Sequence, residues 1–418
     1  MLNHAAQNAE ASLVGALAAK TRSGYSLDQQ FYCDDAVFAA DMREVVARKW
    51  IVAGHLDQIR RKGDYFLYKI GRESIIVIRS DESTVNAFYN VCRHRGSVIC
   101  TEPSGRVTRL TCPYHAWSYG LDGALLAARL MPVDFSKADN GLTRCHVRVF
   151  YGLIFINLSE GAPVDFDATF GDLAPYLDFH GLADAKIAHR QSYPTDANWK
   201  LVVENFVECY HCAPSHPEFC SMHPPHALIA FGAGPSSGPA EAVDQYLPEL
   251  RAWEARAAAL GRPIGTVDDG PESSHLRLLL QRTIREGYDS ETQDGRPASS
   301  LMGKRLGFDK GRMYLSFSPF TQLVATNDFV VLFQFTPRST LKTDVELYWL
   351  VDGRAAQVDV PKMIWGWDET TKQDKVITEN NQLGILSTRY RPGRYSEHER
   401  RVVTFQQWYL AQFGHTLR

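Results

Sequence analysis

The chain has 418 residues, which is enough for two or three domains and a large core. Its formal net charge of −3 gives no reason to expect nucleic acid or an anionic membrane surface as a partner. No apolar run approaches the roughly 20 residues of a membrane span, and residues 1–20 lack the basic and apolar segments of a secretory signal. The eight cysteines form no secreted framework, so we expect a cytoplasmic protein.

The first third of the chain is predicted to change from helix to strand. Residues 27–50 favour helix, because large apolar side chains recur at Phe38, Met42, Val46 and Trp50. Short β-rich runs separated by turn residues follow. They cover residues 65–70, 74–79, 85–89 and 147–158, with a further hairpin turn at residues 121–123.

Beyond residue 162 the patterns mix, as in an α+β domain. Helices are predicted at residues 199–212 (ended by Pro214), 276–286, 361–379 and 396–413, and strands at residues 313–317, 330–335 and 345–351. Residues 246–310 carry no chemical motif and are interpreted as a cover over a site. The predicted organisation is a tail (1–26), a helical lead-in (27–50) that packs on the last domain, a small β domain (51–158) and a larger domain (159–418).

Two short cysteine–histidine pairs are the most specific feature of the sequence. Cys92-Arg93-His94 is followed, after 17 residues, by Cys112-Pro113-Tyr114-His115. Zinc fingers usually group their cysteines together and their histidines together. Mixed pairs instead suit a two-iron cluster in which two thiolates hold one iron and two imidazoles hold the other. A structural zinc site is the alternative interpretation.

The two loops, residues 92–96 and 112–117, resemble the Rieske family closely. The resemblance implies that Cys92, His94, Cys112 and His115 bind a [2Fe-2S] cluster. Neutral imidazole ligands raise the reduction potential above that of an all-cysteine cluster. Such a centre can accept electrons from a ferredoxin or flavin donor.

A second metal site is predicted around His211 and His216. On an unbroken helix these histidines would lie about 140° apart. Because Pro214 is predicted to end the helix between them, His216 can turn back toward His211. Two histidines and one carboxylate, with open positions, form the facial triad of non-heme Fe(II) oxygenases.

Residues 198–200, 204–211 and 216–217 resemble the iron-binding segment of Rieske non-heme iron oxygenase alpha subunits. The resemblance implies an α+β chain with a small all-β Rieske domain and an α+β catalytic domain, whose antiparallel sheet is flanked by helices. It also implies a third iron ligand near the C-terminus, at Asp374, with Asp368 as the rival. Asn205 either supports the iron site or satisfies buried backbone beside it.

Glu208 stands where most relatives have an aspartate. At helical spacing it would share a face with His211 and accept a hydrogen bond from that ring. By resemblance, the same carboxylate is a catalytic bridge that also contacts the Rieske histidine of a neighbouring subunit, here His115, and carries electrons across. A head-to-tail homotrimer follows from this arrangement.

The substrate class is also implied by resemblance. Glu208, the string 208–212 and the segments 381–384 and 390–396 resemble glycine betaine, proline betaine (stachydrine) and carnitine oxygenases, which act on quaternary ammonium compounds. The expected reaction uses O₂ and electrons from NAD(P)H to hydroxylate an N-methyl group, with release of formaldehyde. A separate flavin- or ferredoxin-type reductase is expected, because the sequence has no nicotinamide- or flavin-binding glycine motif. The alternatives are an aromatic-ring hydroxylating dioxygenase and a Rieske electron carrier without oxygenase activity.

Overall fold

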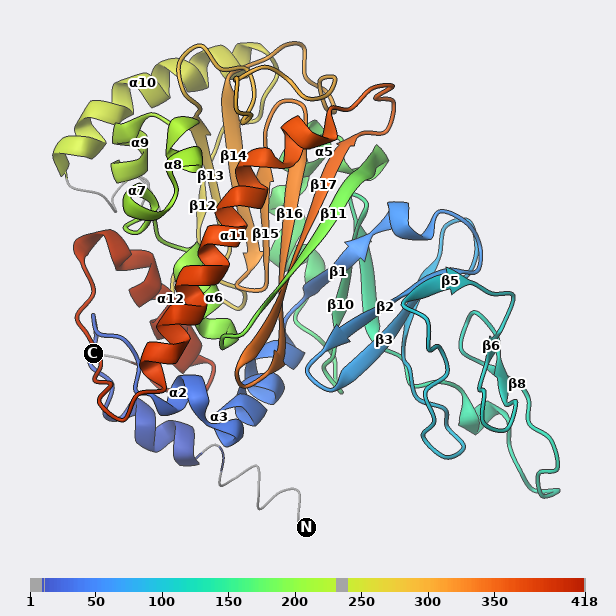
Figure 1. Ribbon diagram of the computed structural model, residues 1–418. Helices are drawn as coiled ribbons and strands as arrows, with labels where there is room; N and C mark the ends of the chain where they lie inside the picture. Colours follow the sequence, from blue (N-terminus) through green and yellow to red (C-terminus); the bar gives the residue numbers. More distant parts are fainter. Residues whose placement is uncertain (1–9, 11, 231–239, 417–418) are drawn as a thin grey trace. The chain divides into compact units, whose positions relative to one another are not determined.

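The computed structural model describes residue 10, residues 12–230 and residues 240–416 (Figure 1). The chain divides into two compact units: Trp50–Phe166 form the small unit, and the described residues up to Lys49 and from Asp167 onward form the large unit. Part of the predicted tail (1–26) lies outside the described residues. Within its described part, residues 12–18 are helical. Along the described chain, no helix is both long enough and apolar enough to cross a membrane.

The small unit is built from antiparallel β-strands, in agreement with the prediction. A three-stranded sheet has the order β1-β10-β9, a four-stranded sheet the order β4-β3-β2-β5, and a second three-stranded sheet the order β6-β7-β8. The strands are β1 (Ile51–His55), β2 (Asp64–Ile70), β3 (Glu73–Arg79), β4 (Val85–Tyr89), β5 (Ser104–Arg106), β6 (Leu110–Thr111), β7 (Ser118–Tyr119), β8 (Leu125–Ala127), β9 (His146–Phe150) and β10 (Leu153–Asn157).

The large unit is organised around a seven-stranded antiparallel sheet with the order β11-β17-β16-β15-β14-β13-β12. Its central strands are buried along most of their length, and they bury polar side chains such as Arg312 and Gln322 beside apolar ones. The strands are β11 (Ala185–Thr195), β12 (Val267–Asp268), β13 (Leu278–Thr283), β14 (Gly311–Ser318), β15 (Thr321–Ala325), β16 (Val330–Ser339) and β17 (Lys342–Asp352).

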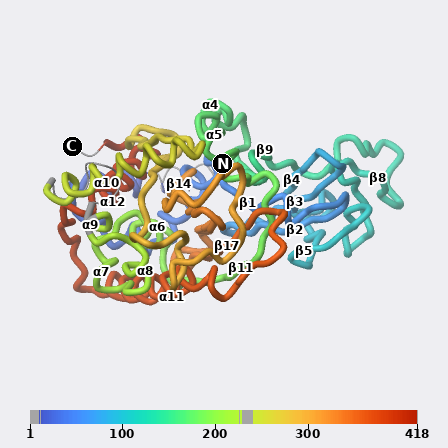
Figure 2. The backbone as a smooth tube through the Cα atoms, turned by 90° about the horizontal axis from the view of Figure 1, so that it is seen from above, coloured from blue at the N-terminus to red at the C-terminus, as the bar shows by residue number. Residues whose placement is uncertain are grey.

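The long helix α11 (Val360–Ile385) crosses the sheet of the large unit (Figure 1). It contacts β11, α6 and α8, and α7 contacts α8 beside it (Figure 2). The other α-helices are α2 (Gln30–Cys33), α3 (Asp35–Ala40), α4 (Phe166–Phe170), α5 (Ala174–Phe179), α6 (Trp199–Phe206), α7 (Cys212–Ser215), α8 (Pro217–Ser221), α9 (Pro225–Ala230), α10 (Ala240–Ala259) and α12 (Arg400–Ala411). A π-helical turn spans Asp41–Val45, and 3-10 turns span Val46–Arg48, Leu56–Ile59, Ala138–Asn140, Gly171–Leu173, Leu182–Asp184 and Glu397–Glu399.

Several sequence predictions of local structure were wrong. The predicted helix at residues 276–286 is the buried strand β13, because a short continuous apolar run suits an interior strand as well as a helix. Strand β15 was missed. The predicted helix at residues 27–50 is broken, because the Asp34 side chain accepts from Ala36 N and starts a new helix. The predicted helix at residues 199–212 ends at Phe206, and Pro214 lies inside the separate helix α7.

Candidate metal centres

The two cysteine–histidine loops of the small unit have the same backbone geometry. In the first, Cys92 N donates to Ser97 O at 2.8 Å and Gly96 N donates to Cys92 O at 3.0 Å. In the second, Cys112 N donates to Trp117 O at 2.8 Å and Ala116 N donates to Cys112 O at 3.0 Å. Each loop turns through a residue of positive φ, +75° at Gly96 and +60° at Ala116. The repeated turn presents one cysteine and one histidine from each loop.

All four predicted cluster residues lie together at these loops. Cys92 and Cys112 are buried, whereas His94 and His115 are exposed. The two imidazole centroids are 4.7 Å apart, and the His94 ring stacks on Trp117 at 4.8 Å. Two inner thiols and two outer imidazoles are the donor set that a Rieske cluster requires.

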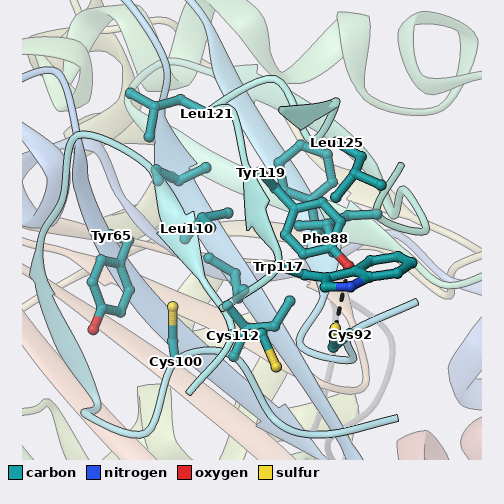
Figure 3. Close-up of a cluster of buried hydrophobic side chains, with 14 residues drawn as sticks. Tyr65, Phe88, Cys92, Cys100, Leu110, Cys112, Trp117, Tyr119, Leu121 and Leu125 are labelled. Atoms are coloured by element: carbon teal, nitrogen blue, oxygen red, sulfur yellow. Dashed lines mark hydrogen bonds between the residues drawn. The ribbon is translucent and has the colours of Figure 1, made fainter. Parts of the chain in front are cut away.

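The thiols belong to the hydrophobic core of the small unit (Figure 3). Burial raises the pKa of the Cys112 thiol, but hydrogen bonds from the backbone of Tyr114 and His115 and from the side chains of Cys92 and Ser97 together outweigh it and bring that pKa below its ordinary value. The Tyr119 hydroxyl lies 3.2 Å from Cys92 Sγ, the contact dashed in Figure 3. Because Arg93 N donates to the same hydroxyl oxygen at 3.1 Å, the Tyr119 proton is free to point at the sulfur.

In the large unit, His211, His216 and Asp374 converge. One ligand atom from each lies within 4.8 Å of the others. Asp374 Oδ1 is 3.4 Å from His211 Nε2 and 3.0 Å from His216 Nε2. His211 precedes α7, His216 lies between α7 and α8, and Asp374 comes from the middle of α11. This is a two-histidine, one-carboxylate donor set, the set suited to non-heme Fe(II).

The rival carboxylate, Asp368, is engaged elsewhere. Its Oδ1 accepts from the Tyr193 hydroxyl at 2.5 Å, and its Oδ2 pairs with Lys372 at 2.7 Å. Asn205 does approach the site, since its Nδ2 donates to Asp374 Oδ1 at 2.7 Å. The structure thus brings Asp374 and Asn205, and not Asp368, to the two histidines.

Glu208 contacts His211, although not from a helix as predicted. Its Oε1 accepts from His211 Nδ1, and its Oε2 accepts from the backbone N–H groups of Tyr210 and His211. These side-chain-to-backbone bonds stabilise a turn after α6 in place of further helix. A disulfide between Cys209 and Cys212, which sequence analysis did not anticipate, closes the same turn.

The three converging side chains are electrostatically coupled. Burial raises the pKa of Asp374, but the two histidines outweigh it and lower that pKa to about 2. Burial lowers the pKa of His211, while Asp374 and Glu208 raise it to about 9. The carboxylate is therefore ionised and ready to act as a metal ligand.

A cavity of about 440 Å³, including its mouth, opens onto this trio. Phe206, Phe219, Trp367, Tyr314 and Arg312 form much of its wall. None of these five residues was assigned to a site from the sequence. Tyr210, which lies between Glu208 and His211 in the chain, is exposed and stacks on His398.

A second cavity of about 1130 Å³ reaches Glu208 and His211 from the side of α12 and the segment 390–395. Glu204, Tyr32 and Tyr395 lie on its wall. Glu208 and His211 thus line both cavities. Sequence reasoning could not foresee this, because the wall combines segments from both ends of the chain.

Comparison with known proteins assigns the family. A model of the Rieske [2Fe-2S] domain matches residues 49–135, and a model of the ring hydroxylating alpha subunit (catalytic domain) matches residues 182–414. The chain belongs to the Rieske oxygenase alpha-subunit family. This membership confirms the predicted fold class and both predicted cofactors, a Rieske cluster and a mononuclear iron.

This Rieske oxygenase alpha subunit is similar along most of its length to proteins of known function. The glycine betaine monooxygenase oxygenase subunit of Pseudomonas aeruginosa (strain UCBPP-PA14) is 37% identical over 400 residues, which cover 92% of this chain and 88% of the relative. The carnitine monooxygenase oxygenase subunit of Acinetobacter baumannii is 35% identical over 198 residues, or 47% of this chain and 53% of the relative. Among solved structures, the quaternary ammonium Rieske monooxygenase CntA with L-carnitine shares the fold, with a TM-score of 0.68, 24% identity and coverage of 96% and 98% of the two chains.

Proposed function

We propose that the protein is the oxygenase component of a two-component system that N-demethylates a small quaternary ammonium compound, with glycine betaine as the first candidate. The observation that carries the proposal is the 37% identity to a glycine betaine monooxygenase oxygenase subunit along 92% of the chain. The chemistry of the cavity supports it. A quaternary ammonium group has no N–H to donate, so aromatic faces are its natural partners, and Phe206, Phe219 and Trp367 provide them.

The residues would divide the work between two metal centres. The cluster would be held by Cys92, Cys112, His94 and His115. The iron would be held by His211, His216 and Asp374. When bound, the cluster supplies single electrons and the iron supplies O₂ activation. The aromatic wall would hold an N-methyl group at the open side of the trio and exclude bulk water.

The overall reaction consumes one O₂, two electrons and two protons. One oxygen atom enters a C–H bond of the N-methyl group, and the other leaves as water. The resulting hemiaminal breaks its C–N bond, releasing formaldehyde and the demethylated amine. A separate reductase would supply the electrons from NAD(P)H.

Glu208 is proposed as the electron bridge between subunits of a homotrimer. Its carboxylate contacts His211 and also lines the second cavity, from which another side chain can approach it. The exposed His115 of a neighbouring copy is the proposed partner. Sedimentation or light scattering of the metal-loaded protein would test the trimer.

A substrate screen tests the proposed function directly. The metal-loaded protein, a generic reductase and NADH are combined with glycine betaine, proline betaine, carnitine or naphthalene, and formaldehyde and O₂ consumption are measured. We expect formaldehyde in a 1:1 ratio to O₂ with one betaine. A ring diol without formaldehyde would instead identify an aromatic-ring dioxygenase, and no oxidation of any compound would favour an electron carrier.

A further inference from the structure

A buried charged cluster lies behind the cavity wall, which it reaches through Arg312, and the proposed chemistry assigns this cluster no role. Glu291 Oε1 accepts from His223 Nε2 at 2.9 Å and from Arg312 Nη1 at 3.2 Å. The three residues are 0%, 3% and 2% exposed. Burying a guanidinium and a carboxylate costs several kcal/mol of desolvation that their attraction does not always offset. Such a pair therefore calls for an explanation when it borders a ligand cavity.

The same cluster also orients the aromatic wall. Glu291 Oε2 accepts from Trp367 Nε1 at 3.2 Å. The Arg312 guanidinium lies over the Phe219 ring at 5.5 Å, and Phe219 packs edge-on against Trp367 at 5.4 Å. A negative group thus lies at the N–H edge of the Trp367 ring, while a positive group lies over the face of the Phe219 ring.

Arg312 shares the cavity with the three converging side chains. It is two residues from Tyr314 on β14, so both side chains project from the same face of the sheet. Both border the cavity that also contains His211, His216 and Asp374. A guanidinium presents five N–H donors in a planar fork, a geometry that can serve two carboxylates at once.

The substrates named for the two relatives, glycine betaine and carnitine, each carry a fixed cation and a carboxylate. The aromatic wall accounts for the cation only. We propose that Arg312 binds the substrate carboxylate, so that the cavity selects zwitterionic methylammonium compounds over cationic ones. This inference rests on the proposed function and adds the residue that sets its substrate class. Glu291 acts as a positioning residue, which fixes Arg312 and Trp367 relative to each other.

The test compares two ligands of nearly equal size. Glycine betaine and its amide share the trimethylammonium group, but only the first has a carboxylate. Dissociation constants are measured by calorimetry under anaerobic conditions, with both metal centres loaded, for the wild type, Arg312→Gln, Arg312→Lys and Phe219→Leu. Thermal melting and iron content confirm that each variant is folded and loaded.

We expect the wild type to bind the betaine more tightly than the amide. Arg312→Gln should lose about 10- to 100-fold in betaine affinity, the range for a hydrogen bond between charged groups, with little change for the amide. Arg312→Lys should recover part of the preference, because it keeps the charge but not the fork. Phe219→Leu should weaken both ligands alike.

Three results would overturn the inference. If Arg312→Gln weakens both ligands equally, the residue only neutralises Glu291. If the wild type binds both ligands equally and releases formaldehyde from both, the proposed function stands and the role of Arg312 is wrong. If the wild type binds neither ligand and demethylates neither, the proposed function and this inference both fail. If Arg312→Gln does not fold, the preference of Arg312→Lys for the betaine over the amide is compared with that of the wild type. An unchanged preference in Arg312→Lys counts against a carboxylate contact.

Discussion

Gln373 Oε1 lies 2.8 Å from Nδ1 of His216. The neighbouring residue on α11, Asp374, faces the other nitrogen of the same ring, Nε2, at 3.0 Å. The amide orientation of Gln373 is set by its Nε2, which donates to Glu218 Oε2 at 2.8 Å. Gln373 therefore accepts the Nδ1 proton, which makes Nε2 the ring nitrogen available to a metal held with His211 and Asp374.

This contact predicts a role for Gln373 in metal affinity. Gln373→Leu should weaken iron binding at the trio by about 10- to 100-fold, the usual cost of losing a contact that orients a ligand. Iron titration of the apoprotein measures it, with the Rieske absorption as an internal reference. Lys372→Ala, on the same helix and exposed, is the matched control. Equal affinities in the two variants would contradict the prediction.

The choice between two carboxylates can be tested by deletion. Asp374→Ala should abolish iron binding at the trio and product formation while leaving the Rieske spectrum unchanged. Asp368→Ala should keep the iron, because this side chain accepts from Tyr193 and pairs with Lys372. Metal analysis of both purified variants measures the iron content. If Asp374→Ala retains the iron and Asp368→Ala loses it, Asp374 is excluded as a ligand.

The electron bridge predicts a kinetic effect without metal loss. Glu208→Gln keeps the size of the side chain but loses its charge. We expect both metals and the oligomer to remain, while a pre-reduced cluster mixed with substrate and O₂ reoxidises at least 10-fold more slowly, given the usual strength of charge-assisted hydrogen bonds. Stopped-flow absorption follows the reaction. Glu208→Asp restores the charge with a shorter reach and should be intermediate, whereas wild-type rates in Glu208→Gln would mean another electron route.

The contact of Tyr119 with Cys92 predicts a shift in reduction potential. A hydrogen bond to a cluster sulfur stabilises the reduced form, which carries more negative charge. Tyr119→Phe should therefore lower the potential by about 40 mV, the one-electron equivalent of about 1 kcal/mol. Redox titration by EPR measures it. Tyr114→Phe is the control, because that ring is exposed at the same loops. An unchanged potential in Tyr119→Phe would rule out this contact as a determinant.

Glu204 predicts a pH dependence of stability. Burial is the main cause that raises its pKa to about 7, although Tyr32 and Gln406 donate to its carboxylate. The folded state then holds the Glu204 proton more tightly than the unfolded state does. Protonated Glu204 therefore contributes to the free energy of unfolding in full below about pH 4.5, and this contribution is lost as pH rises through 7. The second cavity admits water beside Glu204, so we expect a loss on the order of 2 kcal/mol.

The matched variant is Glu204→Gln, which cannot titrate. Urea unfolding between pH 5 and pH 8 should show the wild type losing stability relative to this variant as pH rises. Parallel curves across that range would show that Glu204 is ionised throughout.

The sequence by itself determined the four cluster ligands and the histidine pair of the iron site, because each group lies in short segments whose chemistry is local. The Cys92/His94 and Cys112/His115 pairs come from tight loops whose turns need only a few neighbouring residues, at Gly96 and Ala116. The proximity of His211 and His216 was also local, although the reason given for it was wrong. Their approach comes from the turn stabilised by Glu208 and from the break between α7 and α8, not from Pro214 ending one helix.

Only the tertiary structure decided which distant residues complete the sites. Asp368 and Asp374 lie about 120° apart around one helix, and the packing of α11 against α6 and α8 turns Asp374 toward the histidines. The contacts of Gln373 with His216, and of Glu291 with Arg312 and Trp367, join segments 21 to 157 residues apart. Hydrophobic periodicity predicts which face of a helix or strand is buried, but not which other element packs against that face. These contacts therefore could not be predicted from the sequence.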